Sequence, residues 1–317
     1  MFGLIRRALG AIKYNVYASR LFRTIALPIN RMCEFVSAKI RRRVWINSGQ
    51  VNYDQLRLTF PRNVGVLYAS SIYWNGTAGF EEYTWKVLRI FLGNADVFID
   101  VGSNIGFYAV LSRLVKPSIQ VLAFEPVPSI FKKNILFHQA NKLEHAGVFN
   151  LALGDSVGEQ TIFLPVADYF YEEETTATLR KDSWQAENRN TPLKIQMTTL
   201  DAVMADKFDK KKCLIKVDVE DFEYSVFLGA IGTLKLLRPV IVCELLPRHH
   251  GNYETIELLQ ELNYEFFAIT ESGLFRFQKE DFMSSRSFTD FLALPDRKQS
   301  WRNYISYSDL PNVAVLY

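Results

Sequence analysis

The segment from Asp100 to Gly106 combines residue types that a small-molecule site needs. It reads Asp-Val-Gly-Ser-Asn-Ile-Gly and stands between an apolar run and an amphipathic run. Glycines at 102 and 106 allow a sharp turn and a close approach of the backbone to a ligand. The spacing differs from the G-x-G-x-x-G of dinucleotide sites, and the aspartate disfavours an anion. A ligand with ammonium and sulfonium charges, such as S-adenosylmethionine, suits it better. The residues expected to hold this ligand are Asp100, Gly102, Ser103, Asn104 and Gly106.

A second acid, Glu125, ends the next apolar run and is followed by Pro126. In a doubly wound sheet, a carboxylate at this place accepts hydrogen bonds from both ribose hydroxyls of a nucleoside. The alternative is an exposed acid in a loop. The third apolar run ends at Gly154 and Asp155, where the adenine would lie in such a fold. We therefore predict that Glu125, Pro126, Gly154 and Asp155 complete a nucleoside site.

Candidate groups for catalysis follow the fourth and fifth apolar runs. Methyl transfer to an alcohol requires alignment of the reactants and removal of a weakly acidic proton. Asp218 and Glu220 alternate along the predicted fourth strand, which would point both to the same side. His249 and His250 follow the fifth strand, and an imidazole can accept a proton at neutral pH. We predict these four residues as catalytic candidates, the alternative for the histidines being a polar loop without chemistry.

The acids Asp218, Glu220, Asp221 and Glu223 form a dense group. Oxygen-rich clusters suit Mg²⁺ or Ca²⁺. Side chains at 220, 221 and 223 diverge, however, once a helix begins, and acids at a helix N-terminus also interact favourably with its dipole. We assign no metal ligands, and a divalent metal is an alternative that we do not favour.

Three further residues are candidates for an acceptor site. Trp74 and Glu82 lie in segments that mix aromatic faces with polar tips, as carbohydrate sites do, although packing is the commoner role of such aromatics. Glu244 ends the fifth strand. The polar, acid-rich segment 168–191 has no hydrophobic period, so we interpret it as a loop that could cover the site.

Strands and helices alternate from about residue 96 onward. Such units predict an α/β fold, with a doubly wound, mostly parallel sheet and helices on both faces. Ligands of these sheets bind beyond the carboxyl ends of the strands. The glycine-containing stretch 63–80 is interpreted as turns and short strands. The predicted strands are 96–101, 120–124, 148–153, 214–219, 240–245 and 264–270, the clearest helices are 107–115, 128–141 and 255–262, and a hairpin is expected around Gly158.

The first 43 residues differ in charge from the rest. They contain ten Lys or Arg and one acid, Glu34, a formal charge of +9, whereas the remaining 27 bases and 33 acids give −6. We divide the chain into a basic helical extension, 1–60, and a main domain, 61–317. The extension either packs on the main domain or on a second copy, as in a homo-oligomer, or contacts an anionic membrane or glycolipid surface. We expect no nucleic-acid partner, because no known module is present.

The composition is that of a folded globular chain. Of 317 residues, 49% are hydrophobic and 22% are charged, which excludes a disordered chain. Cys33, Cys213 and Cys243 are widely spaced, so neither a disulfide scaffold nor a zinc knot is expected. No segment is typical of a transmembrane helix. We expect a cytoplasmic protein, or one held peripherally at the inner face of the membrane.

Several motifs, in this order, resemble the FkbM family of S-adenosylmethionine-dependent methyltransferases. They include Ala123-Phe124-Glu125-Pro126 and Ile215-Lys216-Val217-Asp218-Val219-Glu220, and the likeness covers roughly residues 75–270. The resemblance implies a class I, Rossmann-like sheet with a final antiparallel strand, and methyl transfer to a hydroxyl oxygen, often of a sugar. One departure is Asp221, where the family pattern has glycine. The resemblance assigns the cofactor to Asp100, Gly102, Asn104, Gly106 and Glu125.

The sequence thus favours an O-methyltransferase that acts on a hydroxyl of a saccharide, glycan or glycolipid. Two alternatives stay open. A nicotinamide-dependent oxidoreductase has a similar sheet but a G-x-G-x-x-G motif that this chain lacks. A non-catalytic scaffold would keep the sheet and use the basic helices to dock a membrane or an assembly partner.

Overall fold

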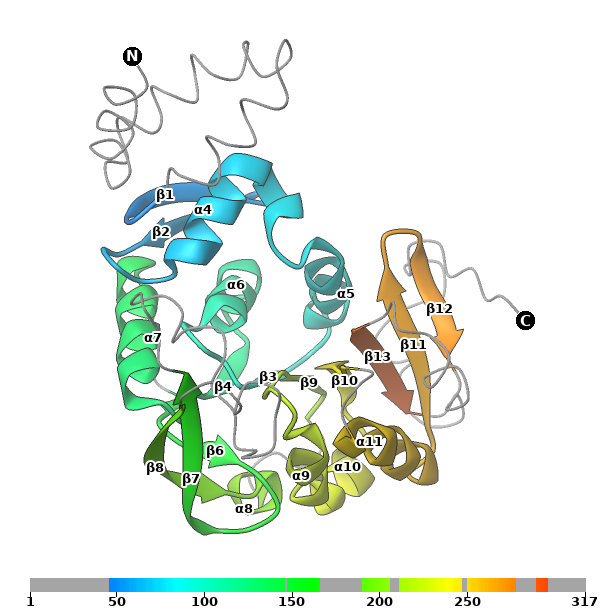
Figure 1. Cartoon of the computed structure of the whole chain (residues 1–317). Coiled ribbons are helices and arrows are strands. Elements are labelled where there is room, and N and C mark those ends of the chain that lie inside the picture. The colour runs from blue at the N-terminus through cyan, green and yellow to red at the C-terminus, as the bar shows by residue number, and fades with distance from the viewer. Residues whose placement is uncertain are drawn as a thin grey trace, which may run out of the picture.

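The centre of the fold is an eight-stranded sheet with the order β12-β11-β13-β10-β9-β3-β4-β5 (Figure 1). The computed structural model describes residues 46–145, 147–165, 190–205, 211–246, 250–277 and 289–295. The strands of this sheet are β3 (Val97–Val101), β4 (Gln120–Phe124), β5 (Val148–Phe149), β9 (Cys213–Val217), β10 (Val240–Glu244), β11 (Tyr264–Thr270), β12 (Gly273–Phe277) and β13 (Asp290–Pro295).

The sheet is mostly parallel. Strand β3 pairs in parallel with β4 and β9, β4 with β5, and β9 with β10. Strand β13 is antiparallel to both of its neighbours, β10 and β11, which confirms the final antiparallel strand that the resemblance implies. The chain builds outward from β3 first toward β4 and later toward β9, so the strand order reverses there. Such a reversal opens a crevice beyond the carboxyl ends of the strands, where ligands bind.

Helices cover both faces of the sheet (Figure 1). Alternate residues of β3 belong to different cores, because Phe98 packs in one apolar cluster whereas Val97 and Ile99 pack in the other. Burial on both faces explains the continuous apolar run of this strand. The predicted doubly wound α/β fold is confirmed. The first face carries α4 (Val66–Asn75), α5 (Glu82–Leu92), α6 (Phe107–Val115) and α7 (Pro128–Ala140), and the second α8 (Leu200–Met204), α9 (Glu223–Leu228), α10 (Ile231–Leu237) and α11 (His250–Glu261).

The predicted third strand, 148–153, is divided between two sheets. Its first part is β5, and its second part, β6 (Ala152–Leu153), pairs with β8 (Asn190–Thr198) in a three-stranded sheet. Between them, the side-chain amide of Asn150 donates to the carbonyl oxygens of Glu125 and Pro126, at 2.9 Å each. These two side-chain hydrogen bonds take the place of strand-pairing hydrogen bonds at the point where the chain leaves the central sheet for the three-stranded sheet. Strand β7 (Gly158–Pro165) pairs antiparallel with β8, so the hairpin is closed beyond Pro165 and not at Gly158.

The stretch 63–80 was predicted as turns and short strands, and this was wrong. It contains α4 and the 3₁₀ turn η1 (Gly76–Gly79). Along α4, Val66, Ala69 and Tyr73 are buried at helical spacing. The serines and the asparagine of this stretch hid that apolar period.

A β-hairpin precedes α4. It consists of β1 (Gly49–Tyr53) and β2 (Leu56–Phe60) and packs on α7, where Asn141 accepts from the Thr59 N–H (2.8 Å) and donates to the Thr59 carbonyl (3.0 Å). Residues 49–60 are therefore strands, where the sequence led us to expect the end of a helical extension. The boundary at residue 60 stays a prediction, since residues 1–45 lie outside the described residues.

Membrane spans and thiols were also considered at the sequence level. Within the described ranges, no helix is long and apolar enough to cross a membrane. Cys213 and Cys243 are buried free thiols on β9 and β10. Cys33 and most of the segment 168–191 lie outside the described residues.

Candidate active site

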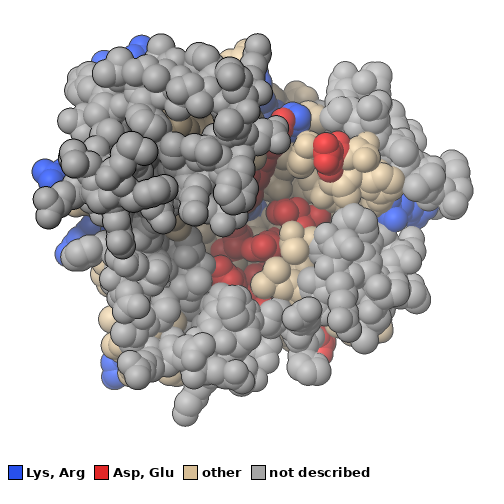
Figure 2. All heavy atoms as spheres, turned by 45° about the horizontal axis from the view of Figure 1, so that its top comes forward, with Lys and Arg blue, Asp and Glu red and all other residues tan. Residues whose placement is uncertain are grey.

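A cavity of about 260 Å³ lies beyond the carboxyl ends of β3, β4, β9 and β10. Figure 2 shows acidic side chains gathered in a hollow of the molecular surface. Lys216 is the basic residue among the described residues that line the cavity. A polar cavity with an excess of acids suits a ligand that carries positive charge or hydroxyl donors. The acids that line it are Glu81, Asp100, Glu125, Asp218, Glu220 and Glu244.

Two glycines shape the loop between β3 and α6. Gly102 and Gly106 have left-handed backbone conformations, with φ of 76° and 81°. A Cβ on Gly102 would lie 1.8 Å from the carbonyl oxygen of Asp218, and one on Gly106 would lie 2.4 Å from Oδ1 of Asn134. Both positions therefore require glycine, for conformation and for space.

The same loop is braced from α7 by Asn134, a fully buried residue that the sequence analysis missed. Its amide donates to Oγ of Ser103 at 3.1 Å and to the carbonyl of Asn104 at 2.9 Å. The Ser103 N–H donates to the Phe124 carbonyl at 2.9 Å. A polar residue on the buried face of a predicted helix was the signal that could have revealed it.

Asp100 projects into the cavity from β3. It is 1% exposed, and within the described residues neither of its carboxylate oxygens has a hydrogen-bond partner. Burial raises the pKa of Asp100 to about 6, although the charge of Lys216 opposes this. An unpaired buried carboxylate is costly, and a cationic ligand in the cavity would compensate it.

Glu125 is held by the backbone on both sides. Its oxygens accept from the N–H groups of Asn104 (3.0 Å) and Val127 (2.8 Å), and burial raises its pKa to about 7. Each oxygen keeps a second lone pair for a ligand hydroxyl. Glu125 and Pro126 both line the cavity, at the end of β4.

Gly154 and Asp155 do not line the cavity, in contrast to residues 151–153 just before them. A Cβ on Gly154 would lie 2.5 Å from Sδ of Met197, so this glycine serves packing. Asp155 is exposed, and its N–H donates to Oγ of Ser225 at 3.1 Å. The apolar residues 151–153 before the turn line the cavity, and the adenine contact predicted for Gly154 and Asp155 stays a prediction.

Asp218 and Glu220 both line the cavity, but not for the reason predicted. Strand β9 ends at Val217, so the two acids do not alternate along it. Glu220 and Asp221 instead have left-handed φ values of 52° and 73°, and the chain turns there. The turn after β9, and not the alternation of side chains along a strand, therefore brings Asp218 and Glu220 to the cavity.

Asp218 is partly exposed and forms an ion pair with a buried lysine. Its Oδ2 lies 2.7 Å from Nζ of Lys216, which is 5% exposed and stands 4.8 Å from the ring centre of Tyr108. Burial disfavours the charged form of Asp218, yet the ammonium of Lys216 outweighs it and lowers the pKa of the carboxyl. A carboxylate with a lowered pKa is a weak proton acceptor at neutral pH. The role of general base predicted for Asp218 is therefore poorly supported by its surroundings.

Two further acids complete this end of the cavity. Burial and the charge of Asp218 raise the pKa of Glu244 to about 10, so Glu244 is neutral at pH 7 and can donate a hydrogen bond. Glu81, which we did not single out, accepts from the hydroxyl of Tyr108 at 2.6 Å. It lies between Phe80 and Glu82, and the sequence analysis predicted Glu82, not Glu81, as an acceptor-site residue.

The other predicted acceptor and catalytic residues lie apart from the cavity or are not described. Trp74 packs edge-on against Tyr73 on α4, and Glu82 pairs with Lys86 at 2.7 Å. Neither lines the cavity. His249 lies outside the described residues, and α11 begins at His250.

The dense acidic group does not form a metal site in the described part of the chain, where no set of three or more His, Cys, Asp or Glu is arranged to hold an ion. Oε1 of Glu223 instead accepts from the Val219 N–H at 3.2 Å. Asp218 thus forms an ion pair, Glu220 and Asp221 form a turn, and Glu223 begins α9.

The strand order, the inserted antiparallel strand and a cavity at the reversal point with acids ending the first two parallel strands define a class I methyltransferase. The model of the methyltransferase FkbM domain matches residues 100–266, more than half of the chain. The chain belongs to this family of S-adenosylmethionine-dependent methyltransferases. Membership in this family favours a methyltransferase over the alternative of a nicotinamide-dependent oxidoreductase.

Solved structures and curated proteins were compared as well. The chain is similar to methyltransferase FkbM from Methylobacillus flagellatus KT, with 13% identity over 63% of this chain and 44% of that chain and a TM-score of 0.36. It is also similar to cofactor-bound Rv0187 from MTB (15% identity, 68% and 79% coverage, TM-score 0.38). The chain is similar to the O-methyltransferase from Bacillus cereus in complex with SAH as well, with 13% identity over 68% of this chain and 80% of that chain and a TM-score of 0.37. This chain thus spans less than half of the first of these proteins. No curated protein matches it.

The residues present fit the cofactor of the family. S-adenosylmethionine supplies an electrophilic methyl group on a sulfonium. Asp100 offers a buried carboxylate to its positive charges, and Glu125 offers fixed acceptor atoms to hydroxyls. Because Gly102 has no Cβ, the loop after β3 can pack directly against the carbonyl of Asp218 at the edge of the cavity.

Proposed function

We propose that this chain methylates a hydroxyl of a saccharide, glycan or glycolipid, and that the acceptor carries no net negative charge. The observation that carries the proposal is the composition of the cavity beyond the cofactor loop. Glu81, Asp218, Glu220 and Glu244 meet there with one cation, Lys216. Carboxylates accept hydrogen bonds from hydroxyl groups, and this excess of acids repels phosphate or carboxylate on an acceptor.

Aromatic side chains support the same substrate class. Tyr68, Phe80 and Phe107 line the cavity and contact one another, with ring centres 4.4 to 5.5 Å apart. Aromatic faces pack on the apolar C–H surface of a sugar while polar groups fix its hydroxyls. The wall therefore combines the two kinds of contact that a sugar requires.

The test is incubation of the full chain with methyl-labelled cofactor and matched sets of neutral, amino and acidic glycans and glycolipids. We expect an alkali-stable methyl ether on a neutral or amino saccharide, located by fragmentation mass spectrometry. Asp100→Ala, which lacks the cofactor carboxylate, is the control for enzymatic transfer. Label found only on acidic glycans, on an amine or as an alkali-labile ester would contradict the proposal.

For the basic region 1–43 we propose a peripheral contact with an anionic membrane surface, at the inner face of the cytoplasmic membrane. Its formal charge of +9 supports this, since clustered Lys and Arg bind anionic lipids. Sedimentation with vesicles of phosphatidylglycerol or phosphatidylcholine tests it. We expect the full chain to bind only the anionic vesicles, and the replacement of Arg41, Arg42 and Arg43 by Gln to weaken that binding. Binding to neither vesicle would favour the alternative, packing on the main domain or on a second copy.

A further inference from the structure

A hydroxyl acceptor must lose its proton during methyl transfer, and the proposed function therefore requires a base in the cavity. We infer that Glu81 is this general base, that Tyr108 orients it, and that Tyr53 and Asp54 hold the segment that carries it. The inference rests on the proposed function, because an acceptor without a dissociable proton would need no base. Neither the family match nor the sequence analysis assigns a role to these residues.

The placement of Glu81 is unusual for its residue type. It lies between η1 and α5, with φ 38° and ψ 44°, in the left-handed region that non-glycine residues rarely adopt. It is the N-cap of α5, yet its side chain makes no capping bond. Ser, Thr, Asp or Asn would stabilise the helix better at this position. Strained residues of this kind cluster at functional sites.

The side chain of Glu81 is directed to the cavity. Its Oε2 accepts the hydroxyl hydrogen bond of Tyr108 at 2.6 Å. Within the described residues no hydrogen bond is made to Oε1, and Glu81 lines the cavity wall. One oxygen is thus anchored, and the other is available for an acceptor hydroxyl.

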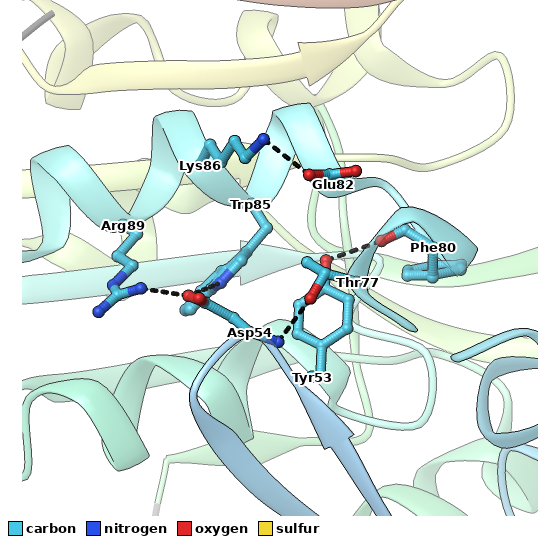
Figure 3. A network of polar contacts seen from close by, with 8 residues as sticks. All are labelled: Tyr53, Asp54, Thr77, Phe80, Glu82, Trp85, Lys86 and Arg89. Carbon is cyan, nitrogen blue, oxygen red and sulfur yellow. Dashed lines mark hydrogen bonds and ion pairs between the residues drawn. The ribbon is translucent and has the colours of Figure 1, made fainter. Parts of the chain in front are cut away.

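The backbone that carries Glu81 is fastened to the N-terminal hairpin (Figure 3). The Tyr53 hydroxyl donates to the carbonyl of Phe80 at 2.7 Å, and the Asp54 N–H donates to Oγ1 of Thr77 at 2.8 Å. These two hydrogen bonds fix the two ends of the segment 77–80, which directly precedes Glu81.

The carboxylate of Asp54 also ties the hairpin to α5. It accepts from Nε1 of Trp85 at 3.2 Å and pairs with Arg89 (Figure 3). On the same helix, Glu82 pairs with Lys86, apart from these contacts. Glu81 and Glu82 are therefore neighbours in sequence with different surroundings, one at the cavity and one in a surface ion pair.

Two of the other acids at this end, Asp218 and Glu244, are less suited to accept a proton. Asp218 pairs with Lys216 at 2.7 Å, and burial together with the charge of Asp218 raises the pKa of Glu244 and so favours its neutral form. Asp100 and Glu125 belong to the cofactor loop and its nucleoside side. Burial raises the pKa of Glu81 to about 7, within the range at which a base is half-ionised at physiological pH.

Charged groups from several elements act on Glu81. Lys216 on β9 lowers its pKa, as does the hydrogen bond from Tyr108 on α6, whereas Asp218 after β9 and Asp290 on β13 raise it. The hydroxyl of Tyr53 on β1 has a raised pKa, first from burial and then from the charges of Glu81 and other nearby acids, so it remains a donor. The charge state of Glu81 is thus set by burial and by groups on or next to β9, α6 and β13.

In the proposed step, the acceptor oxygen forms a bond to the methyl carbon as the carbon–sulfur bond breaks. The electron pair of that bond stays on sulfur, which becomes a neutral thioether. The hydroxyl proton passes to Oε1 of Glu81, and the products are a methyl ether, S-adenosylhomocysteine and a neutral Glu81. Water at the open side of the cavity removes the proton before the next turnover.

The experiment compares pH profiles of kcat/KM for the full chain and for Glu81→Gln, Glu81→Asp and Tyr108→Phe. Glu159→Gln is the matched control, since Glu159 pairs with Lys194 on β7 and β8, away from the cavity. We expect the wild type to show an acidic limb near pH 7. Glu81→Gln should lose that limb and about 10²- to 10⁴-fold in kcat, with the affinity for S-adenosylhomocysteine within about twofold of wild type.

The two conservative variants sharpen the test. Glu81→Asp should retain part of the rate, and Tyr108→Phe should move the acidic limb to higher pH, because a lost hydrogen bond to the carboxylate raises its pKa. A Glu81→Gln enzyme that binds S-adenosylhomocysteine normally and keeps the wild-type rate and profile would overturn the inference. Methylation by the wild type of an amine or a carboxylate, with no hydroxyl methylated, would instead refute the proposed function. Circular dichroism of each variant separates loss of folding from loss of catalysis.

Discussion

The two ends of the cavity are built differently. The cofactor end is formed by the backbone, since Gly102 and Gly106 leave no room for a Cβ and Glu125 accepts two N–H groups. The end that we assign to the acceptor is lined by side chains from β9, β10, α6 and the turn before α5. The first end resists change because its shape depends on main-chain atoms. The second can alter its charge and specificity through single residues, which suits a fold that accepts many substrates.

The largest expected effect is at Gly102. Gly102→Ala places a Cβ 1.8 Å from a carbonyl oxygen at positive φ, so we expect a loss of about 4 kcal/mol or more in unfolding free energy and no cofactor binding. Gly76→Ala is the matched control, because Gly76 has φ 67° with nothing within 4 Å of its Cβ. Gly76 also has ψ −147°, so its backbone strain alone should cost about 1–3 kcal/mol. Urea denaturation measures both, and equal losses would show that the close contact is unimportant.

The ion pair between the buried Lys216 and the partly exposed Asp218 gives the next effect. Lys216→Met leaves Asp218 without its counterion, and we expect a loss of about 3–5 kcal/mol in unfolding free energy. Lys194→Met removes an exposed pair with Glu159 and should cause no measurable change. If the two variants were equally stable, Lys216 would not be buried in solution.

Glu125→Gln tests the cofactor end by affinity. An amide nitrogen would face one of the two N–H donors that the carboxylate now accepts, and the ribose hydroxyls would lose a charged acceptor. We expect affinity for S-adenosylhomocysteine to fall by about 1–3 kcal/mol, measured by titration calorimetry. Asp100→Asn should lose a similar amount, and unchanged affinity in both variants would reject the cofactor assignment.

The smallest effect is on pH dependence. Burial raises the pKa of Glu125 to about 7 in the folded chain, against about 4.3 when unfolded. The folded state therefore holds a proton that the unfolded state has lost, and this stabilisation disappears as pH rises through 7. His138, whose pKa burial lowers to about 4, does not titrate in this window.

Between pH 6.5 and 8 the ligand-free protein should thus lose on the order of 1 kcal/mol of stability from Glu125 alone. Burial raises the pKa of Glu223 to about 8, so this residue adds to the same trend. Glu125→Gln should weaken the dependence without abolishing it, because Glu81 and Glu223 lose protons in the same window. Thermal melts at the two pH values measure it, and a Tm that rises with pH would contradict these assignments.

Much of the cofactor end was predictable from the sequence because its information is local. An apolar run, two glycines four residues apart and an acid at each strand end suffice to place Asp100 and Glu125, since strand pleating and glycine conformation depend on neighbouring residues. The predicted bounds of β11 coincide with the observed ones, and those of β3, β4 and β10 differ by one residue at most.

Only the tertiary structure decided the acceptor end. Whether Asp218 is paired, whether Glu244 is neutral and which of Glu81 and Glu82 reaches the cavity depend on burial and on charges from distant elements. A sequence pattern records residue type and spacing. The charge state of a side chain arises from Coulomb interactions and desolvation among groups that can be far apart along the chain, as Glu81 and Asp290 are, and these act only after the chain has folded.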